Sequence, residues 1–313
     1  MLAGFDVGGT KVLGLLIDPA TGTVLERGRG SSAGDGATLV ATIATMAETL
    51  VARSGAEIEV VGLGVAGLAH RSGVVRYSPN LPDLVEFPIA ARLGDRLGVP
   101  VALGNDASAG ALAEARFGAG RGVTDFVFVN LGTGIGAGLV VDGQLRAGAN
   151  GFAGEAGHMI VDLDGPEHLT GHRGPWEYFA SGNALGRMGR EAAAAGRFAA
   201  GLELAGAVET ITGEHVGRAV TDGDAEAAVV LDGFCREVAR GAANLVLVLD
   251  PHRLVIGGAA IEIGEPLRAG VDRWLGALLL GAAHRPAVEV RLAELGADAN
   301  ALGAGLLARE LLD

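Results

Sequence analysis

The strongest constraint on the fold is a pair of glycine-rich turns, each placed between two apolar segments and far apart in the chain. The first unit runs from Asp6 through Gly8-Gly9-Thr10 to Asp18, and the second runs from Asn130 through Gly132-Thr133-Gly134 to Asp142. In both units a polar residue stands twelve positions before an aspartate. Because the order of apolar, glycine-rich and polar positions is the same, the spacing predicts a duplicated β-hairpin.

The turns also suggest a ligand. Glycine has no Cβ, so the backbone N–H groups of a Gly/Thr turn can approach phosphate oxygens closely. An ordinary tight hairpin explains either turn taken alone. The matched pair favours a nucleotide held between the two copies.

Composition narrows the class of protein. The chain has 313 residues, enough for two domains, and 49% of them are hydrophobic against 19% charged. The formal net charge of −13, with scattered Lys and Arg, argues against a nucleic-acid partner, because binding phosphate chains needs clustered cations. No apolar run could span a bilayer or form a signal peptide, so we expect a cytoplasmic protein without a membrane partner. Cys235, the only cysteine, is expected to be a buried structural thiol.

The first half of the chain shows a β-β-β-α-β order. After the hairpin we expect a short strand near 24–25, a helix over 37–56, a strand over 58–65, a helix over 89–97, a strand over 99–103 and a helix over 107–117. Residues 77–82 hold two prolines and are expected to form a loop. Asp106 then falls at a strand-to-helix junction, where ligand-binding side chains converge in α/β folds.

The second half repeats this plan and is expected to be richer in helix. The expected elements are strands over 126–131 and 136–141, an irregular stretch over 148–181, a helix over 224–249, a strand over 253–256, a helix over 266–280, a strand over 288–292 and a closing helix over 298–312. No linker rich in Pro or Ser separates the halves, so we place a hinge near 106–120.

Four motifs, in order, resemble the signatures of the ROK family of sugar kinases, which includes bacterial glucokinases. They are residues 6–11 (DVGGTK), 104–106 (GND), 131–136 (LGTGIG) and 154–158 (GEAGH). The resemblance covers almost the whole chain and implies the α/β actin-like ATPase fold, with two ribonuclease-H-like domains around an ATP and sugar cleft. The implied domains are a smaller one over 1–115, joined by the C-terminal helix 298–313, and a larger one over 116–297.

The same resemblance implies a nucleotide site with ATP and Mg²⁺ as cofactors. Phosphate contacts are expected from Asp6, Gly8, Gly9, Thr10 and Lys11 on one side and from Gly132, Thr133 and Gly134 on the other. Gly257 and Gly258 resemble the loop on the adenosine side. A homodimer is also implied.

Asp106 is the candidate catalytic base. Phosphoryl transfer needs positioned phosphates and one group that accepts the proton of the attacking hydroxyl. Both the family resemblance and the position of Asp106 at a strand end beside a phosphate site support this role. The simpler alternative is an N-cap for the helix that begins at Ala107, and the two roles are compatible.

Sugar recognition needs carboxylate, amide and imidazole groups, because every ring hydroxyl is both donor and acceptor. By resemblance, Glu155, His158 and Glu177 contact the reducing end, Asn105 and Asp106 the far end, Gly67 lines the pocket and Asn80 completes the set. Asn80 also fits a plain turn residue between prolines, and Glu177 fits a plain charge at a helix start.

One motif departs from the family pattern. Many ROK proteins bind zinc through the histidine that resembles His158 and a Cys-x-Cys-Gly-x-x-Gly-Cys stretch, but residues 168–177 read HLTGHRGPWE, without cysteine. We expect His158, His168 and His172 to be solvated, without a carboxylate partner, and no structural zinc. Apolar burial of Trp176, Tyr178 and Phe179 is expected to anchor the loop instead.

The leading hypothesis is therefore an ATP-dependent hexose 6-kinase, with glucose as first choice. An N-acetylmannosamine or N-acetylglucosamine kinase is the alternative within the fold. A sugar-responsive ROK regulator is disfavoured, because the first turn begins too near residue 1 to leave room for a helix-turn-helix domain. A non-catalytic sugar-binding module is expected to lack Asp106 or one of the turns, and both are present. Polyphosphate stays open as a donor, although the acidic chain is a poor match for a polyanion.

Overall fold

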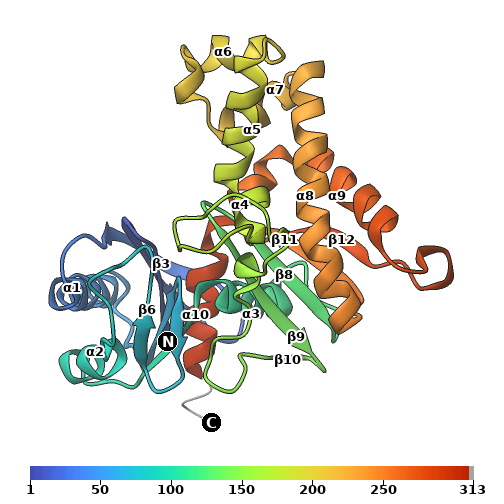
Figure 1. Ribbon diagram of the computed structural model, residues 1–313. Coiled ribbons are helices and arrows are strands. Elements are labelled where there is room, and N and C mark those ends of the chain that lie inside the picture. The colour runs from blue at the N-terminus through green and yellow to red at the C-terminus, as the bar shows by residue number, and fades with distance from the viewer. Residues whose placement is uncertain (310–313) are drawn as a thin grey trace. The chain divides into compact units, whose positions relative to one another are not determined.

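The computed structural model describes residues 1–309 and divides into two compact units (Figure 1). The first unit contains Met1–Gly122, Gly138–Gly154 and the described chain from Glu294 onward; the second contains Val123–Ala137 and Glu155–Ala293. The part of the predicted closing helix beyond residue 309 lies outside the described residues. Among the described helices, none is long and apolar enough to cross a membrane.

The first unit is built on a five-stranded sheet with the order β3-β2-β1-β4-β7. Its strands are β1 (Leu2–Val7), β2 (Lys11–Ile17), β3 (Val24–Ser31), β4 (Val60–Val65) and β7 (Val101–Asn105). The predicted hairpin is confirmed: β1 pairs antiparallel with β2, whereas β1, β4 and β7 run parallel. β3 is longer than the sequence predicted. Every second residue of this edge strand is exposed, which left too few apolar positions to reveal its length.

Four helices of this unit cover or extend the sheet. They are α1 (Gly36–Ser54), α2 (Ile89–Leu97), α3 (Asp106–Phe117) and α10 (Ala299–Arg309). α1 is capped at its N-terminus by Asp35, whose side chain accepts a hydrogen bond from the N–H of Thr38, and at its C-terminus by Gly55 in the left-handed region. Its apolar face joins a core that includes Phe5, Ile43 and Leu50.

The helix α10 packs on β1, β4 and α3 with almost no side chains between the backbones. A Cβ built on Gly4 would lie 1.9 Å from the carbonyl oxygen of Ala301, and one on Gly62 would lie 1.7 Å from that of Ala304. On the helix itself, a Cβ on Gly303 would lie 1.7 Å from the carbonyl oxygen of Ala109. Glycine at these positions therefore lets the last helix of the chain reach the first strand closely.

Glu114 of α3 is a fully buried carboxylate. It accepts hydrogen bonds from the backbone N–H groups of Ala119 at 2.6 Å, Glu294 at 3.1 Å and Leu295 at 2.9 Å. A Cβ on Gly118 would lie 2.0 Å from this carboxylate, so glycine is required there. The charge is thus satisfied by backbone donors from two separate segments.

A short hairpin of β5 (Leu68–His70) and β6 (Val74–Tyr77) was missed from the sequence. Its strands have three and four residues, too few to show a period. The predicted loop follows directly after Tyr77 and carries Asn80.

The second five-stranded sheet has the order β10-β9-β8-β11-β12. Its strands are β8 (Phe126–Leu131), β9 (Ile135–Val141), β10 (Gln144–Leu145), β11 (Arg253–Gly257) and β12 (Glu289–Leu292). β11 is parallel to both β8 and β12, as the predicted repetition of the plan implies.

The first unit also contains the segment Gly138–Gly154, which includes the end of β9 and all of β10. The sequence predicted this segment to be part of the larger domain. A Cβ on Gly138 would lie 2.3 Å from that of Ala111 on α3, and the N–H of Arg71 donates to the carbonyl of Asn150. These contacts explain why the segment belongs to the first unit. Its composition did not indicate this.

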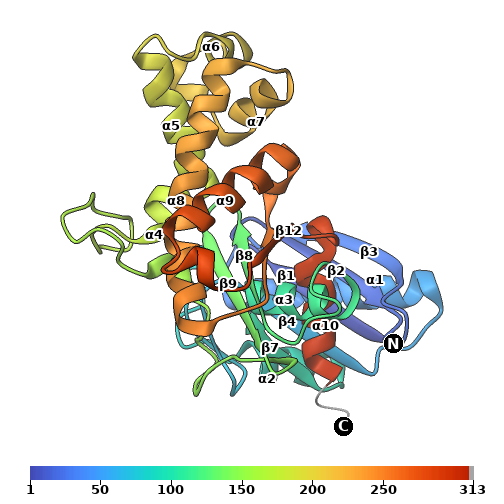
Figure 2. The ribbon, with the colours of Figure 1, turned by 90° about the vertical axis from the view of Figure 1, so that its right-hand side faces the viewer.

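The remaining helices of the second unit are α4 (Trp176–Ala180), α5 (Gly182–Ala194), α6 (Ala199–Ala205), α7 (Gly213–Thr221), α8 (Ala225–Leu249) and α9 (Glu265–Leu278) (Figure 2). The long predicted helix α8 is confirmed and packs along α9. Cys235 of α8 is buried as expected, and its burial, with the charge of Asp232, raises the pKa of the thiol to about 12. At neutral pH it is a protonated structural thiol.

Candidate active site

Two carboxylates meet at the carboxyl ends of the parallel strands in the first unit. Asp6 stands near the end of β1, and Asp106 follows β7 as the first residue of α3. The strand between them, β4, carries Gly64 opposite Asp6, and a Cβ there would lie 3.4 Å from the Cα of Asp106. The missing side chain lets Asp106 pack closely on β4, and the charges of Asp6 and Asp106 interact. No salt bridge of the described residues includes either one.

Both carboxyl groups hold their protons more tightly than usual. Burial, and then the charge of Asp106, raise the pKa of Asp6 to about 7, while a hydrogen bond from the side chain of Asn300 opposes the rise. Burial also raises the pKa of Asp106, and the N–H of Ala107 opposes this. A carboxylate with a raised pKa is a stronger base, which suits proton transfer near neutral pH.

Asn105 is the main cap of α3. Its side-chain oxygen accepts hydrogen bonds from the N–H groups of Ala107 at 2.9 Å and Ser108 at 3.1 Å. The carboxylate of Asp106 accepts a hydrogen bond from the N–H of Ala107 at 2.9 Å. The sequence left open a capping role for Asp106, but Asn105 is the N-cap of α3 and Asp106 is the first residue of the helix.

Two of the residues predicted to bind the sugar, Asn105 and Asn80, each lie close to another residue predicted for the site. The side-chain amide of Asn105 donates to the carbonyl of Gly67 at 3.5 Å, a long hydrogen bond. In the first turn, the N–H of Gly8 donates to the carbonyl of Lys11, and a Cβ on Gly9 would lie 3.0 Å from that of Asn80. Gly9 and Asn80 line one cavity of about 140 Å³. The first-turn site, as we name it, thus contains Asp6, residues 8–11, Gly67, Asn80, Asn105 and Asp106.

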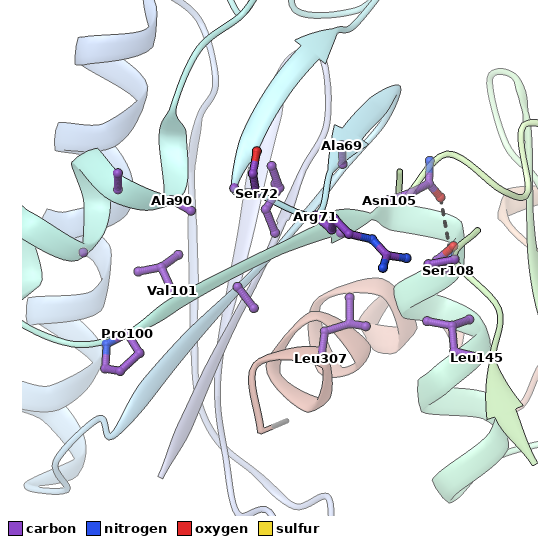
Figure 3. A pocket seen from close by; sticks show the side chains of 18 of the residues that line it. Ala69, Arg71, Ser72, Ala90, Pro100, Val101, Asn105, Ser108, Leu145 and Leu307 are labelled. Carbon is purple, nitrogen blue, oxygen red and sulfur yellow. Dashed lines mark hydrogen bonds between the residues drawn. The ribbon is translucent and has the colours of Figure 1, made fainter. Parts of the chain in front are cut away.

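A larger hollow of the first unit, of about 760 Å³, runs along β7 (Figure 3). Arg71, Ser108 and Leu307 line it, and of the predicted site residues it includes Asn105. It shares no residue with either glycine-rich turn.

In the second unit, Glu177 supports the second turn. Its carboxylate accepts a hydrogen bond from the N–H of Ile135 at 2.7 Å, and a Cβ on Gly134 would lie 2.2 Å from the same oxygen. The other oxygen lies 3.2 Å from Nε2 of His168. Glu177 was predicted as a sugar ligand, and the structure shows that it also joins the turn to the loop that precedes α4.

The loop histidines differ from each other, which corrects part of the sequence analysis. His168 has a carboxylate partner in Glu177 and its side chain is only 9% exposed; burial lowers its pKa, and the charge of Glu177 opposes this. His158 is 39% exposed, with Nε2 3.9 Å from a carboxylate oxygen of Glu155. His172 is exposed as expected. The partner of His168 is nine positions away in the sequence, so no local motif indicated this pair.

One aromatic side chain anchors this loop. Trp176 is fully buried, its indole N–H donates to the carbonyl of Glu237 at 2.9 Å, and its ring fills the space above Gly241. Tyr178 and Phe179 are only partly buried and stack with Arg187 and Arg240. The predicted apolar anchor is thus confirmed for Trp176 and is wrong for the other two. The second-turn site, as we name it, contains residues 132–134, Glu155, His158, His168 and Glu177.

A pocket of about 470 Å³ opens beside the second turn and was missed from the sequence. Its lining includes Gly132, Thr133, Asn183, Gly213, Arg218 and Glu262. Gly258, which resembles part of the loop on the adenosine side, packs under the turn, where a Cβ would lie 2.4 Å from the carbonyl of Leu131. The pocket begins at the next residue, Ala259. The sequence signals that could have indicated this pocket are Ser181-Gly182 and Thr212-Gly213. In each pair a helix-capping residue is followed by glycine at the start of a helix.

Comparison with known proteins gives a consistent result. The model of the ROK family matches residues 2–311. A glucokinase of Streptomyces coelicolor is 35% identical over 319 residues, covering 98% of this chain and 97% of the relative. An N-acetylgalactosamine kinase of Shewanella sp. is 32% identical over 320 residues, covering 99% and 97%. A ROK family glucokinase from Streptomyces griseus, solved in complex with glucose and AMPPNP, superposes with a TM-score of 0.90 at 34% identity, covering 99% of both chains. The chain therefore belongs to the ROK family and is a sugar kinase with the actin-like ATPase fold.

Proposed function

We propose that the protein transfers the γ-phosphoryl group of ATP to the 6-hydroxyl of a hexose, with glucose as the preferred substrate. The observation that carries this proposal is the Asp106 carboxylate, which is held at the end of β7 by the Asn105 cap and has a raised pKa. Support for glucose and ATP comes from the similar Streptomyces griseus enzyme, which was solved with glucose and an ATP analogue.

In the proposed mechanism Asp106 accepts the proton of the sugar hydroxyl while that oxygen forms a bond to the γ-phosphorus. The bond from the γ-phosphorus to the β–γ bridging oxygen breaks, and ADP leaves with the electron pair. Residues 8–11 and 132–134 bind phosphate oxygens of the same ATP through backbone N–H groups. Asn80, Glu155, His158 and Glu177 orient the sugar.

Mg²⁺ fits this scheme as the counter-ion that enters with ATP. Of the residues in the two turns, only Lys11 is basic, so the turns themselves supply little positive charge for a triphosphate. When bound with ATP, the cation would neutralise charge on the phosphate oxygens. We also propose that no structural zinc is needed, because Glu177 and Trp176 hold the loop. Elemental analysis and activity after treatment with a zinc chelator, then excess Mg²⁺, test this; one tightly bound zinc per chain would contradict it.

The decisive experiment is an ADP-release assay over a panel of glucose, mannose, N-acetylmannosamine, N-acetylglucosamine and N-acetylgalactosamine. The highest kcat/KM is expected with glucose. A higher value with an acetamido sugar would favour the second candidate, an N-acetylhexosamine kinase. This candidate is supported by the similarity to the N-acetylgalactosamine kinase of Shewanella sp., which is 32% identical. Direct measurement of sugar phosphate with polyphosphate in place of ATP tests the other donor.

By family resemblance we also propose a cytoplasmic homodimer. Light scattering on the purified protein measures its mass in solution, and a mass near 31.4 kDa would show a monomer and contradict the proposal.

A further inference from the structure

His168 lies in the loop that precedes α4 and is the most buried of the three loop histidines. Its side chain is 9% exposed, although the sequence predicted a solvated residue here. Its backbone is fixed on both sides: the N–H donates to the carbonyl of His172 at 2.8 Å, and the carbonyl accepts from the N–H of Gly171 at 2.8 Å. The imidazole ring therefore has a defined place in the second unit.

The two ring nitrogens of His168 have different partners. Nε2 lies 3.2 Å from Oε1 of Glu177, and Nδ1 lies 3.0 Å from the hydroxyl oxygen of Thr170. A carboxylate can only accept a hydrogen, so the favourable tautomer carries its proton on Nε2, and Nδ1 accepts from the Thr170 hydroxyl. Burial lowers the pKa of His168, which favours this neutral form. Thr170 therefore helps to keep the ring proton on the nitrogen next to Glu177.

Glu177 uses its two carboxylate oxygens separately. Oε2 accepts a hydrogen bond from the N–H of Ile135 in the second turn at 2.7 Å, and Oε1 lies next to His168. Within residues 1–309, no other ion pair includes Glu177. A carboxylate that is held at one oxygen can still rotate about its last bond, whereas contacts at both oxygens leave it one orientation.

We propose that His168 is a positioning residue that fixes the Glu177 carboxylate and thereby couples sugar binding to the second glycine-rich turn. This inference rests on the proposed function, in which Glu177 orients the sugar. His168 also lies beside His158, another proposed sugar contact, with the ring centroids 6.4 Å apart and the rings 60° from parallel. One buried side chain is thus next to two residues that orient the sugar and, through Glu177, acts on the turn that binds phosphate.

The first test is steady-state kinetics of four variants. His168→Ala removes the contact with Glu177, and we expect the KM for sugar to rise about fivefold and the KM for ATP about threefold, with kcat within about twofold of wild type. His168→Gln places an amide N–H near the position of Nε2 and is expected to restore most of both KM values. Thr170→Val removes the hydroxyl donor at nearly constant volume, and intermediate KM values are expected. The matched control is His172→Ala, because this histidine of the same loop is exposed.

The pattern of the two KM values separates positioning from other roles. Direct contact of His168 with the sugar would raise only the KM for sugar. A purely structural role would lower Tm and the active fraction without a selective change in either KM. Both of these results would overturn the inference. If His168→Ala does not fold, Thr170→Val decides: raised KM values for both substrates support the coupling, and wild-type values contradict it.

A second measurement separates this inference from the proposed function. Hydrogen exchange of the Ile135 amide, followed by NMR without any substrate, reports whether Glu177 still holds the turn. We expect this amide to exchange about tenfold faster in His168→Ala than in wild type, and at the wild-type rate in His172→Ala. That result would support the positioning role even if the protein phosphorylates another sugar. An Ile135 amide that exchanges equally fast in all the variants would overturn the inference, whatever the substrate.

Discussion

The first-turn site and the second-turn site are built on the same strand-turn-strand plan but treat their carboxylates in opposite ways. In the first, Asp6 and Asp106 face each other without a paired cation among the described residues, and both have raised pKa values. In the second, Glu177 accepts from the N–H of Ile135 and pairs with His168. A carboxylate that pairs with a neighbouring imidazole and a backbone N–H holds these neighbours in place, whereas a carboxylate with a raised pKa and no paired cation is suited to proton transfer. The difference suggests that the first site supplies the proton chemistry and the second supplies position.

The largest effect is expected at Asp106. Asp106→Asn keeps the shape of the side chain but removes its ability to take a proton, so kcat is expected to fall by about 100-fold or more. Sugar affinity, measured by calorimetry on the same variant, is expected to stay close to wild type. Glu57→Gln, on an exposed connection of the same unit, is the control. Near-normal turnover of Asp106→Asn would remove it from the role of base and break the comparison.

The next effect concerns binding in the second-turn site. Glu155→Gln and His158→Ala are each expected to raise the KM for sugar by about 30-fold with a much smaller change in the KM for ATP, because we propose that these side chains contact sugar hydroxyls. Glu167→Gln, an exposed carboxylate on the same loop, is the control. If both KM values rise equally, this stretch serves the nucleotide.

A smaller effect is expected from the support that Glu177 gives the second turn. A Cβ in Gly134→Ala would overlap the Glu177 carboxylate, so the turn must shift, and the KM for ATP is expected to rise about tenfold. Gly233→Ala on α8, outside both turns, is the control, because a Cβ there meets nothing within 4 Å. Equal kinetics of the two alanine variants would show that the Glu177 contact does not hold the turn.

The smallest effect is a change in stability from Asp6. Its pKa is raised from 3.8 to about 7 in the folded protein, so the stability it contributes is present below pH 3.8 and is lost as pH rises through about 7. Asp6→Asn removes this loss. We expect its Tm to exceed that of wild type by about 3 °C at pH 8, the shift that roughly 1 kcal/mol produces, and by less at pH 5. A Tm difference that is the same at both pH values would contradict the raised pKa.

Much of the fold followed from local sequence patterns. The helix over 89–97 was predicted with its observed bounds, and the β1–β2 hairpin was predicted from its glycine-rich turn. Strands with an exposed face or with few residues were harder to predict, because β3 and the β5–β6 hairpin show too little apolar periodicity. The site was predicted as a set of residues but not as a set of contacts.

The reason is that the important contacts join positions far apart in the chain. Glu177 reaches Ile135 across 42 positions, and Trp176 reaches Glu237 across 61 positions. The family resemblance named Glu177 as a sugar ligand, but only the fold shows that the same carboxylate supports the turn. The pocket beside the second turn is likewise assembled from the starts of α5 and α7 and from residues 259–263, which have no common spacing.

The buried carboxylate of Glu114 has a consequence for local unfolding. The chain first leaves the first unit after Gly122, passes through it again over Gly138–Gly154 and returns to it for the last time at Glu294. The donors to Glu114 stand just before the first exit and at the last return. One side chain therefore ties together two connections that are more than 170 positions apart. The amide hydrogens of Ala119, Glu294 and Leu295 should exchange with solvent as one cooperative group, at a rate set by a single opening event.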